Sequence, residues 1–587
     1  MLHLRAVGVR AKPWLTATRS LSKFVGGKKE GEYDLCVIGG GPAGFAGAVR
    51  GWDFGGKVAL VEKGKIWGAG MWDGALSSKI LWQLSRSTRQ MREYASAKGK
   101  HDADLYMTWQ DVVSHVKEAQ AHKIKQYMAQ IEALKRGHNS NENASMDFYH
   151  GEAQFQDPHT IAVMEEGDDG TTVEKTIRAK NFLICTGSSP RKLRGFPFDG
   201  NHIMTSDDIF KLPDFPKSVM IIGAGVIGCE FATIFGAFGE SEVHLLNQGK
   251  SRLLPAEDVE VSTLIQSNLQ RLGVHVHNNS QLLDLRLIEG RGVEVTLGHP
   301  VVDEDDDKVF MPDPPFFVER VLFSVGRSPQ ERLEKLNVKA AGVSLDSRGG
   351  LHVDDEGCCI GTKHIFGAGD CTLTVGLVNV AEMEARHAVE VMVGAPKDSV
   401  TTLGYNHVSS IMFLYPEVAC VGISEQEARK KKIPHLVARL GLDVVNRAII
   451  NLHGSRSISD KLSPRRAGFV KMICTDDEEK RLLGMRFVGQ GAGSIIQAGA
   501  MLISQKRSVR EIERLLHPHP AVTEAVQEVA RMLSGYTGEG TSAGSIFKPH
   551  VFPQSCRVTR YKPAFTDALA DSHEGKADVP NYVSSSD

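Results

Sequence analysis

Two glycine patterns, each directly after a run of apolar residues, constrain this chain more than any other feature of its sequence. They comprise Gly39, Gly41 and Gly44 after residues 35–38, and Gly223, Gly225 and Gly228 after residues 219–222. This spacing permits a tight turn from strand to helix and brings backbone N–H groups and a helix N-terminus against a pyrophosphate. The sequence therefore predicts two βαβ units that hold two dinucleotides at once, and transfer of electrons between two cofactors is the first interpretation.

The composition is that of a large globular chain. The 587 residues are 41% apolar and 24% charged, and the formal net charge is -2. This length suits several domains, and this balance supports a sizeable core. The near-zero net charge gives no basis for binding nucleic acid or an anionic membrane. The longest uncharged stretch, residues 487–505, is interrupted by glycine and glutamine, so we expect no membrane span.

The N-terminal segment and the cysteines indicate where in the cell the protein resides. Residues 1–29 contain Lys and Arg but no acidic residue, with apolar residues interspersed and no continuous apolar core. This composition is typical of an organelle transit peptide, and a frayed basic tail is the alternative. The nine cysteines lack the spacing of metal ligands, which favours reduced thiols. We therefore expect a protein of the mitochondrial matrix.

The rest of the pattern alternates strands and helices. Residues 33–62 predict strand, helix and strand, residues 75–98 and 109–136 predict helices, and the acidic stretch 303–308 predicts an exposed hairpin. The last residues, 534–587, carry Gly, Ser, Pro and scattered aromatic residues. This extension either docks a partner protein or is disordered.

Four further segments carry a resemblance to a known family. They are VLFSVGRSP (321–329), TKHIFGAGD (362–370), YPEVACVG (415–422) and HPHPAVTE (517–524). With the two glycine patterns, their order resembles that of the FAD-dependent pyridine nucleotide-disulfide oxidoreductases, which include dihydrolipoyl dehydrogenase, glutathione reductase and soluble pyridine nucleotide transhydrogenase. The resemblance spans residues 31–535.

The resemblance implies an α/β fold with two Rossmann-like dinucleotide-binding domains and a C-terminal α+β dimerisation domain. The implied organisation is a transit peptide at 1–29, an FAD-binding domain at 30–190 and 329–398, an NAD(P)-binding domain at 191–328, a dimerisation domain at 399–535 and an extension at 536–587. We therefore expect FAD and NAD(P) as cofactors and a homodimer.

The resemblance also assigns residues to the cofactors. FAD is expected at the first glycine pattern, with Glu62 on the adenosine ribose hydroxyls, Asp370 at the ribityl or phosphate end and Gly187 where the backbone passes closely. The second glycine pattern and Gly326 complete the cofactor-binding set. Plain turns and helix caps are the alternative roles of these residues.

A departure from the family concerns its redox cysteines. Members that reduce disulfides carry Cys-x-x-x-x-Cys at the start of the helix after the first nucleotide unit, where this chain has Gly70 and Ala75. Neither side chain can form a thiolate or a mixed disulfide, so the usual relay from reduced flavin to a dithiol is predicted to be absent. Cys358 and Cys359 are the alternative redox-active thiols.

Two charged residues that serve hydride transfer are retained. The resemblance places Lys79 near flavin N5 and pairs it with Glu230. A cation there stabilises the anionic reduced flavin, so the pair indicates that the flavin is reduced during turnover. A salt bridge that only holds two domains together is the alternative.

The second nucleotide site has Asn247 where NAD-specific relatives have an acid. Loss of the carboxylate removes its repulsion against a 2′-phosphate, and Lys250 or Arg252 can neutralise that phosphate, so both NADH and NADPH are expected to bind. In this respect the chain is similar to the soluble transhydrogenase. The alternative is that Lys250 and Arg252 are solvated loop charges.

Together these features predict a transhydrogenase in which one nucleotide reduces FAD and leaves before an oxidised nucleotide takes the hydride back. His519 and Glu524 match the family's acid–base dyad, although no thiol is left for it to serve. The dyad is then a structural remnant at the dimer interface or serves another acceptor, such as a quinone. A dihydrolipoyl dehydrogenase relative with an unrecognised thiol and a non-catalytic FAD-binding mitochondrial scaffold are the other hypotheses.

Overall fold

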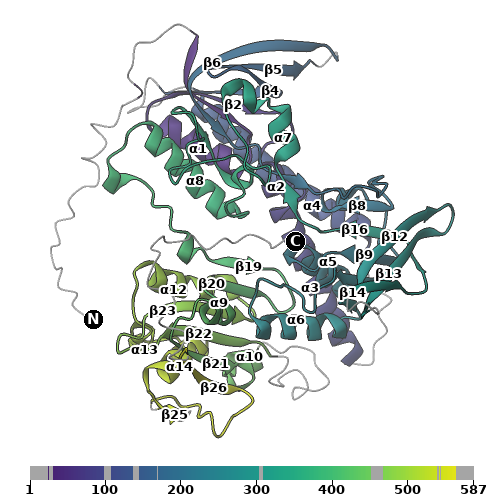
Figure 1. The fold of residues 1–587 in the computed structure, drawn as a ribbon, viewed down its shortest axis with the longest axis vertical. Coiled ribbons are helices and arrows are strands. Elements are labelled where there is room, and N and C mark those ends of the chain that lie inside the picture. The colour runs from purple at the N-terminus through teal and green to yellow at the C-terminus, as the bar shows by residue number, and fades with distance from the viewer. Residues whose placement is uncertain are drawn as a thin grey trace, which may run out of the picture. The chain divides into compact units, whose positions relative to one another are not determined.

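The computed structural model describes residues 24, 31–97, 107–135, 144–167, 170–302, 308–450, 467–538, 541–542 and 544–563 (Figure 1). Contacts divide the chain into two compact units. The first comprises Met1–Gly68, Lys123–Ser188 and Ser328–Leu403, and the second comprises Ala69–His122, Ser189–Arg327 and Gly404–Asp587. The predicted transit peptide lies outside the described residues except for Phe24, and so does the extension from residue 564 onward.

The first unit is built on a seven-stranded sheet with the order β3-β2-β1-β6-β5-β4, in which β18 also pairs with β6. The strands are β1 (Glu32–Ile38), β2 (Lys57–Glu62), β3 (Ser145–His150), β4 (Glu152–Asp157), β5 (Thr160–Glu166), β6 (Thr172–Ile184) and β18 (Ile365–Gly367). β1 runs parallel to β2 and β6, whereas β4 and β5 are antiparallel. The helices of this unit include α1 (Pro42–Asp53), α7 (Gln330–Lys335) and α8 (Val378–Met392).

Strand β1 is buried on both faces, which explains its continuous apolar sequence. Leu35 and Val37 belong to the core cluster that also contains residues of α1 and α8. Cys36 and Ile38 belong to the cluster on the opposite face of the sheet. Successive side chains of a strand point to opposite faces, so every residue of this run is withdrawn from water.

The nucleotide part of the second unit contains a five-stranded parallel sheet with the order β11-β10-β9-β16-β8. Its strands are β8 (Ile203–Thr205), β9 (Ser218–Ile222), β10 (Glu242–Asn247), β11 (His275–Asn278) and β16 (Arg320–Phe323), and its helices are α5 (Val226–Phe238) and α6 (Val259–Arg271). A second, antiparallel sheet consists of β12 (Gln281–Ile288), β13 (Gly292–Val302), β14 (Lys308–Pro312) and β15 (Phe316–Val318).

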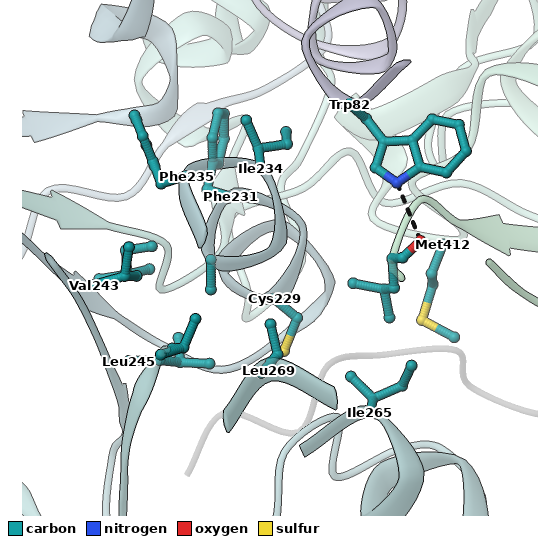
Figure 2. Close-up of a cluster of buried hydrophobic side chains, with 14 of the residues drawn as sticks. Trp82, Cys229, Phe231, Ile234, Phe235, Val243, Leu245, Ile265, Leu269 and Met412 are labelled. Atoms are coloured by element: carbon teal, nitrogen blue, oxygen red, sulfur yellow. Dashed lines mark hydrogen bonds between the residues drawn. The ribbon is translucent and has the colours of Figure 1, made fainter. Parts of the chain in front are cut away.

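The two helices α5 and α6 cover one face of the parallel sheet. Figure 2 shows Phe231 and Phe235 of α5 and Val243 of β10 in the buried apolar cluster that also contains Cys229 and, beside it, Leu269 of α6. The long helix α3 (Ala75–Ala97) also packs against α5. Residues 69–122 therefore belong by contacts to the second unit, although the sequence-based division put them in the FAD-binding domain.

The C-terminal part of the second unit is a six-stranded sheet with the order β19-β20-β23-β22-β21-β26. Its strands are β19 (Ser410–Met412), β20 (Val418–Gly422), β21 (His435–Gly441), β22 (Phe469–Thr475), β23 (Leu482–Val488) and β26 (Cys556–Tyr561). Its helices are α9 (Glu425–Lys430), α10 (Asn446–Ile450), α12 (Ala492–Ser504), α13 (Arg510–Arg514) and α14 (Thr523–Ser534), and β24 (Tyr536–Gly538) pairs with β25 (Thr541–Ser542). Apolar residues of α12 and α14 form its core with β20 to β23.

The predicted fold class is confirmed, and the extension is the main correction. The predicted helices correspond to α3 and to α4 (Trp109–Leu134). Val302 pairs with Lys308 in the predicted hairpin, whose turn lies outside the described residues. β26 pairs antiparallel with β21, so the hypothesis of a disordered extension is wrong for residues 544–563. None of the described helices is both long and apolar enough to cross a membrane.

Candidate nucleotide-binding and hydride-transfer residues

The first glycine pattern forms a turn that only glycine fits at two of its positions. Gly39 has φ +102°, and a Cβ there would lie 2.3 Å from the Cys185 carbonyl oxygen. A Cβ at Gly44 would lie 1.7 Å from the Gly39 carbonyl oxygen. Gly41 caps α1, and nothing in the described chain lies within 4 Å of a Cβ placed on it. The turn therefore leaves open space at the helix N-terminus, where an anion is stabilised.

Glu62 lies at the end of β2 beside this turn. Its Oε2 accepts a hydrogen bond from the Gly40 N–H at 2.6 Å, and its Oε1 accepts one from the Gly64 N–H at 2.7 Å. These bonds fix the carboxylate and leave each oxygen a lone pair for a hydroxyl donor. The geometry fits a ribose diol at this position.

The turn after β6 also has features that fit a bound polar ligand. Gly187 has φ +67°, and the preceding Thr186 carries a buried Oγ1 that has no hydrogen-bond partner within the described chain. The Thr186 carbonyl oxygen accepts a bond from Arg332 at 2.8 Å. Buried hydroxyls are usually paired, so the unpaired Oγ1 is consistent with a polar ligand in this turn.

Asp370 lies in a short 3-10 turn after β18. Its Oδ2 accepts a hydrogen bond from Ser188 Oγ at 2.7 Å. The neighbouring Gly369 approaches the start of α1, because a Cβ on it would lie 3.4 Å from the Ala43 side chain. The structure thus brings the first glycine pattern, Gly187 and Asp370 to the same edge of the first unit's sheet, near the carboxyl ends of β1 and β6. This is where open α/β sheets bind ligands.

The second glycine pattern repeats the first turn. Gly223 has φ +104°, and a Cβ on it would lie 2.6 Å from the Ser324 carbonyl oxygen. A Cβ at Gly228 would lie 1.9 Å from the Gly223 carbonyl oxygen, whereas Gly225 has open space. Ser324 Oγ is buried without a hydrogen-bond partner in the described residues, as Thr186 Oγ1 is at the first turn. Gly326 follows with φ +99° and accepts a bond from the Arg191 N–H at 3.0 Å.

Asn247 ends β10 and is almost fully buried, with 2% of its surface exposed. Its amide nitrogen donates to the Lys250 carbonyl oxygen at 3.0 Å and to Asn278 Oδ1 at 3.1 Å. Arg252 donates from two guanidinium nitrogens to the carbonyl oxygens of Glu257 and Pro255 at 2.7 and 2.6 Å. The amide of Asn247 and two nitrogens of Arg252 therefore hold the loop itself, and Lys250 of the same loop is half-buried.

Lys79 and Glu230 form an ion pair within the second unit. Lys79 Nζ donates to Glu230 Oε2 at 2.9 Å, and the exposed fractions of the two side chains are 30% and 8%. Glu230 Oε1 also accepts from the Phe413 N–H at 2.9 Å, while Lys79 Nζ donates to Ser78 Oγ at 3.2 Å. The buried carboxylate is thus held from two sides, and it orients a partly exposed ammonium group.

The thiols are free and mostly buried. All nine cysteines are free, and all except Cys358 are buried. Burial raises the pKa of Cys371 and of Cys420 to about 12. Burial also raises the pKa of Cys358, against the opposing effect of its hydrogen bond to Thr362. Because the thiolate is the nucleophile, a raised pKa lowers the fraction of each of these thiols in the nucleophilic form.

No cysteine lies in the sequence between Cys36 and Cys185. The segment where the redox pair was expected contains α2 (Gly68–Met71) and the start of α3, with Gly70 and Ala75 at the two predicted positions. A hydrogen bond joins α2 to the start of α3, since Ser77 Oγ donates to the Met71 carbonyl oxygen at 2.6 Å.

His519 and Glu524 form a hydrogen-bonded pair near the start of α14. His519 Nδ1 lies 2.7 Å from Glu524 Oε1, and the His519 side chain is 65% exposed. Partial burial raises the pKa of Glu524, but hydrogen bonds from His519 and from the Ala521 N–H outweigh it, so that the pKa is lowered. The imidazole therefore keeps an oriented and solvent-accessible Nε2.

Comparison with known proteins identifies the fold family. The family described as pyridine nucleotide-disulphide oxidoreductase matches residues 33–385, and its dimerisation domain matches residues 408–530. The chain belongs to the pyridine nucleotide-disulphide oxidoreductase family. FAD and NAD(P) are the cofactors of this family, and both glycine turns fit dinucleotides. The chain is therefore an FAD-dependent pyridine nucleotide oxidoreductase, as the sequence predicted at this level.

Several relatives in this family are dihydrolipoyl dehydrogenases. A mitochondrial dihydrolipoyl dehydrogenase of Schizosaccharomyces pombe is 29% identical over 87% of this chain and 91% of that protein. A dihydrolipoamide dehydrogenase of Chaetomium thermophilum is 30% identical over 85% of this chain and 91% of that protein. The crystal structure of LpdA from Mycobacterium tuberculosis has a TM-score of 0.69 at 24% identity, covering 85% of this chain and 99% of that one, and supports the fold.

Sequence reasoning missed the residues that hold the predicted ones in place. Ser188 donates a hydrogen bond to Asp370, and Arg332 donates one to the Thr186 carbonyl oxygen. The Phe413 N–H donates one to Glu230. The hydroxyls of Thr186 and Ser324 had a detectable signal, because each follows a parallel strand and lies one or two residues before a glycine, Gly187 or Gly326. The Phe413 contact had none, since a backbone donor from a distant segment leaves no mark in a sequence pattern.

Proposed function

We propose that this chain oxidises NAD(P)H through FAD and returns the electrons to NAD(P)⁺ without a disulfide relay. The observation that carries the proposal is the Lys79–Glu230 ion pair between α3 and α5, together with the absence of cysteine at the start of α3. FAD supplies the two-electron chemistry when it is bound. The chain has kept residues that serve flavin reduction and lacks the thiols through which disulfide-reducing relatives pass the electrons on.

In this proposal the ion pair tunes the charge at the flavin. Glu230 is anchored by the Phe413 N–H and keeps the Lys79 ammonium oriented. An oriented cation favours the added negative charge of a reduced ring and needs no rearrangement during the reaction. Lys79 is therefore a catalytic residue and Glu230 a positioning residue.

Nucleotide choice is assigned to the loop after β10. Asn247 presents no carboxylate to the ribose, so a 2′-phosphate is not repelled. Lys250 supplies a compensating charge for NADPH, while Arg252 mainly holds the loop through backbone carbonyls. We therefore propose that NADH and NADPH use the same site in turn.

Anaerobic stopped-flow spectroscopy tests this function. The FAD-loaded protein is reduced with NADPH and then mixed with excess thio-NAD⁺. Loss of the flavin absorbance followed by its rapid return is the expected result, and Lys79→Met should slow both phases. Lys335→Met is the matched control, because Lys335 pairs with Glu331 on the exposed face of α7. Reduction that no oxidised nucleotide reverses would contradict the proposal.

Dihydrolipoamide oxidation is the second candidate, because the relatives at 29% and 30% identity carry that name. It requires a thiol relay in this chain. NAD⁺-dependent oxidation of dihydrolipoamide that iodoacetamide abolishes would favour this candidate, whereas no turnover with dihydrolipoamide favours the transhydrogenase.

We also propose a homodimer in the mitochondrial matrix. The match to the family's dimerisation domain and the exposed His519–Glu524 pair support the dimer, and the basic N-terminal composition supports the location. The molar mass of the purified protein, measured by light scattering, tests the homodimer. Fusion of residues 1–29 to a fluorescent protein tests the location, and a cytosolic fusion would contradict it.

A further inference from the structure

Three imidazoles and a carboxylate gather at the edge of the parallel sheet in the second unit. Glu242 and His244 lie on β10, and His275 and His277 lie on the edge strand β11. The register pairs His244 with His275, and Leu246 with His277. Side chains paired across parallel strands, and those two residues apart on one strand, point to the same face. The fold therefore places all three imidazoles side by side.

One atom from each of three residues converges on a common point. His244 Nε2 and His275 Nε2 each lie 3.5 Å from Glu242 Oε1. The three potential ligand atoms all lie within 4.8 Å of one another. Ligand atoms around a tetrahedral zinc ion with bonds of 2.0–2.1 Å are separated by about 3.4 Å. Small side-chain rotations bring these three atoms to that spacing.

His277 provides the support that a metal-binding histidine requires. His277 Nε2 lies 3.1 Å from His244 Nδ1, on the other side of the ring from Glu242. With the His244 Nδ1 proton donated to His277, the lone pair of His244 Nε2 points toward the convergence. Metal-binding histidines commonly donate their second ring nitrogen in this way, which fixes the tautomer and the ring orientation.

The surroundings keep the cluster oriented and accessible. The His244 ring stacks between those of His275 and His277 and contacts Phe316 of β15, with centroids 4.8, 5.3 and 5.0 Å away. The His244 side chain is 13% exposed, whereas Glu242 and His275 are 59% and 56% exposed. An ion can thus enter from solvent and meet a preformed ligand.

We propose that Glu242, His244 and His275 bind a divalent late first-row metal ion of the zinc type. Two imidazole nitrogens and one carboxylate oxygen form a ligand set that suits zinc, with the fourth position left to water. The site lies at the start of β10, away from Asn247 at its other end, so it is separate from the nucleotide loop. A bound ion would tie the edge strand β11 to β10.

Zinc titration of the FAD-loaded, chelator-treated full-length protein against a chromogenic chelator tests the proposal. One tightly bound zinc per chain is expected, with binding weakened at least about tenfold by His275→Gln or His277→Ala. His352→Gln is the matched control, because His352 is an exposed histidine of the first unit. Unchanged zinc affinity in His275→Gln, or an equal loss in His352→Gln, would overturn the proposal.

Two further measurements keep the result decisive. Flavin absorbance and circular dichroism establish that each variant is folded, which the exposure of His275 favours. X-ray absorption of the zinc-loaded protein should show only nitrogen and oxygen ligands. Sulfur ligands would place the zinc on a cysteine and contradict the assignment.

Discussion

The two glycine turns share a backbone and differ in the side chain that ends the following strand. In both, the first glycine has a φ near +100° and the last admits no Cβ, since its position lies 1.7 or 1.9 Å from a carbonyl oxygen. Glu62 ends the strand after the first turn with a carboxylate held by two backbone N–H groups. Asn247 ends the strand after the second turn and is buried against its own loop.

This difference separates two tasks of a dinucleotide site. The turn itself accommodates a pyrophosphate, which every dinucleotide has, so its geometry can be duplicated without change. The strand-end residue faces the ribose, where nucleotides differ. An anchored carboxylate suits a ribose diol, whereas a neutral amide tolerates a 2′-phosphate. Under the proposed function, this difference suits the first unit to retaining FAD and the second to admitting either nicotinamide nucleotide.

The largest expected effect comes from the last glycine of each turn. In Gly44→Ala or Gly228→Ala the new Cβ overlaps a backbone carbonyl, which costs about 3 kcal/mol of stability. We expect Gly44→Ala to be purified without FAD, and Gly228→Ala to retain FAD but fail to be reduced by NADPH. Flavin absorbance and thermal unfolding measure both. FAD loss from Gly228→Ala alone would show that the two turns are assigned the wrong way round.

Gly41 and Gly225, the middle glycines of the two turns, test the comparison of the turns further, because the protein leaves room for a Cβ at both positions. Gly41→Ala and Gly225→Ala should leave the unfolding temperature of the ligand-free protein unchanged. Each should weaken only its own dinucleotide by about tenfold or more, equivalent to about 1.4 kcal/mol. Equilibrium dialysis for FAD and KM values for NADH and NADPH measure this. Unchanged affinities would mean that no phosphate approaches these positions.

The strand-end residue is expected to set preference rather than binding as such. Asn247→Asp introduces a carboxylate, so the ratio of kcat/KM for NADPH to that for NADH should fall by about tenfold, or 1.4 kcal/mol. Lys250→Gln should lower the same ratio by removing a charge, with NADH turnover preserved. Arg286→Gln, whose side chain is exposed on strand β12, is a control for loss of surface charge. A ratio that does not change in either variant would remove this loop from nucleotide selection.

The smallest effect is expected from thiol modification. Burial raises the pKa of the thiols, so the thiolate fraction at pH 8 is below that of a free cysteine and increases only as pH rises further. Iodoacetamide at pH 8 should label the half-buried Cys358 slowly and the buried thiols hardly at all, and the labelled protein should keep its NADPH-dependent turnover. Peptide mass spectrometry locates the label. Rapid inactivation at one cysteine would support the thiol-dependent alternative.

Much of the fold could be predicted from the sequence because its determinants are local. The apolar runs before each glycine turn, the helices after them and the strand-end residues Glu62 and Asn247 lie within two short βαβ segments. The family resemblance added the order of domains. It also paired Lys79 of α3 with Glu230 of α5, and the structure has this ion pair where α3 packs on α5 in the second unit.

The parts that escaped prediction depend on long-range contacts. The strand β26 is short and polar, and only its pairing with β21 makes it a strand. Arg252 looks like a phosphate ligand in sequence, but its donors are engaged by the carbonyls of Pro255 and Glu257. The histidines of the proposed metal site lie on β10 and β11, and the alternation of Glu242 with His244 and of His275 with His277 was their local signal.

The central claim is that the reduced flavin passes no electrons to a cysteine pair of this chain, and an anaerobic reductive titration tests it most directly. The FAD-loaded protein is titrated with dithionite while flavin absorbance is followed to its end point. Our account predicts complete reduction with two electrons per FAD, because no dithiol shares them. An end point at four electrons per FAD would reveal a redox-active cysteine pair and contradict the account.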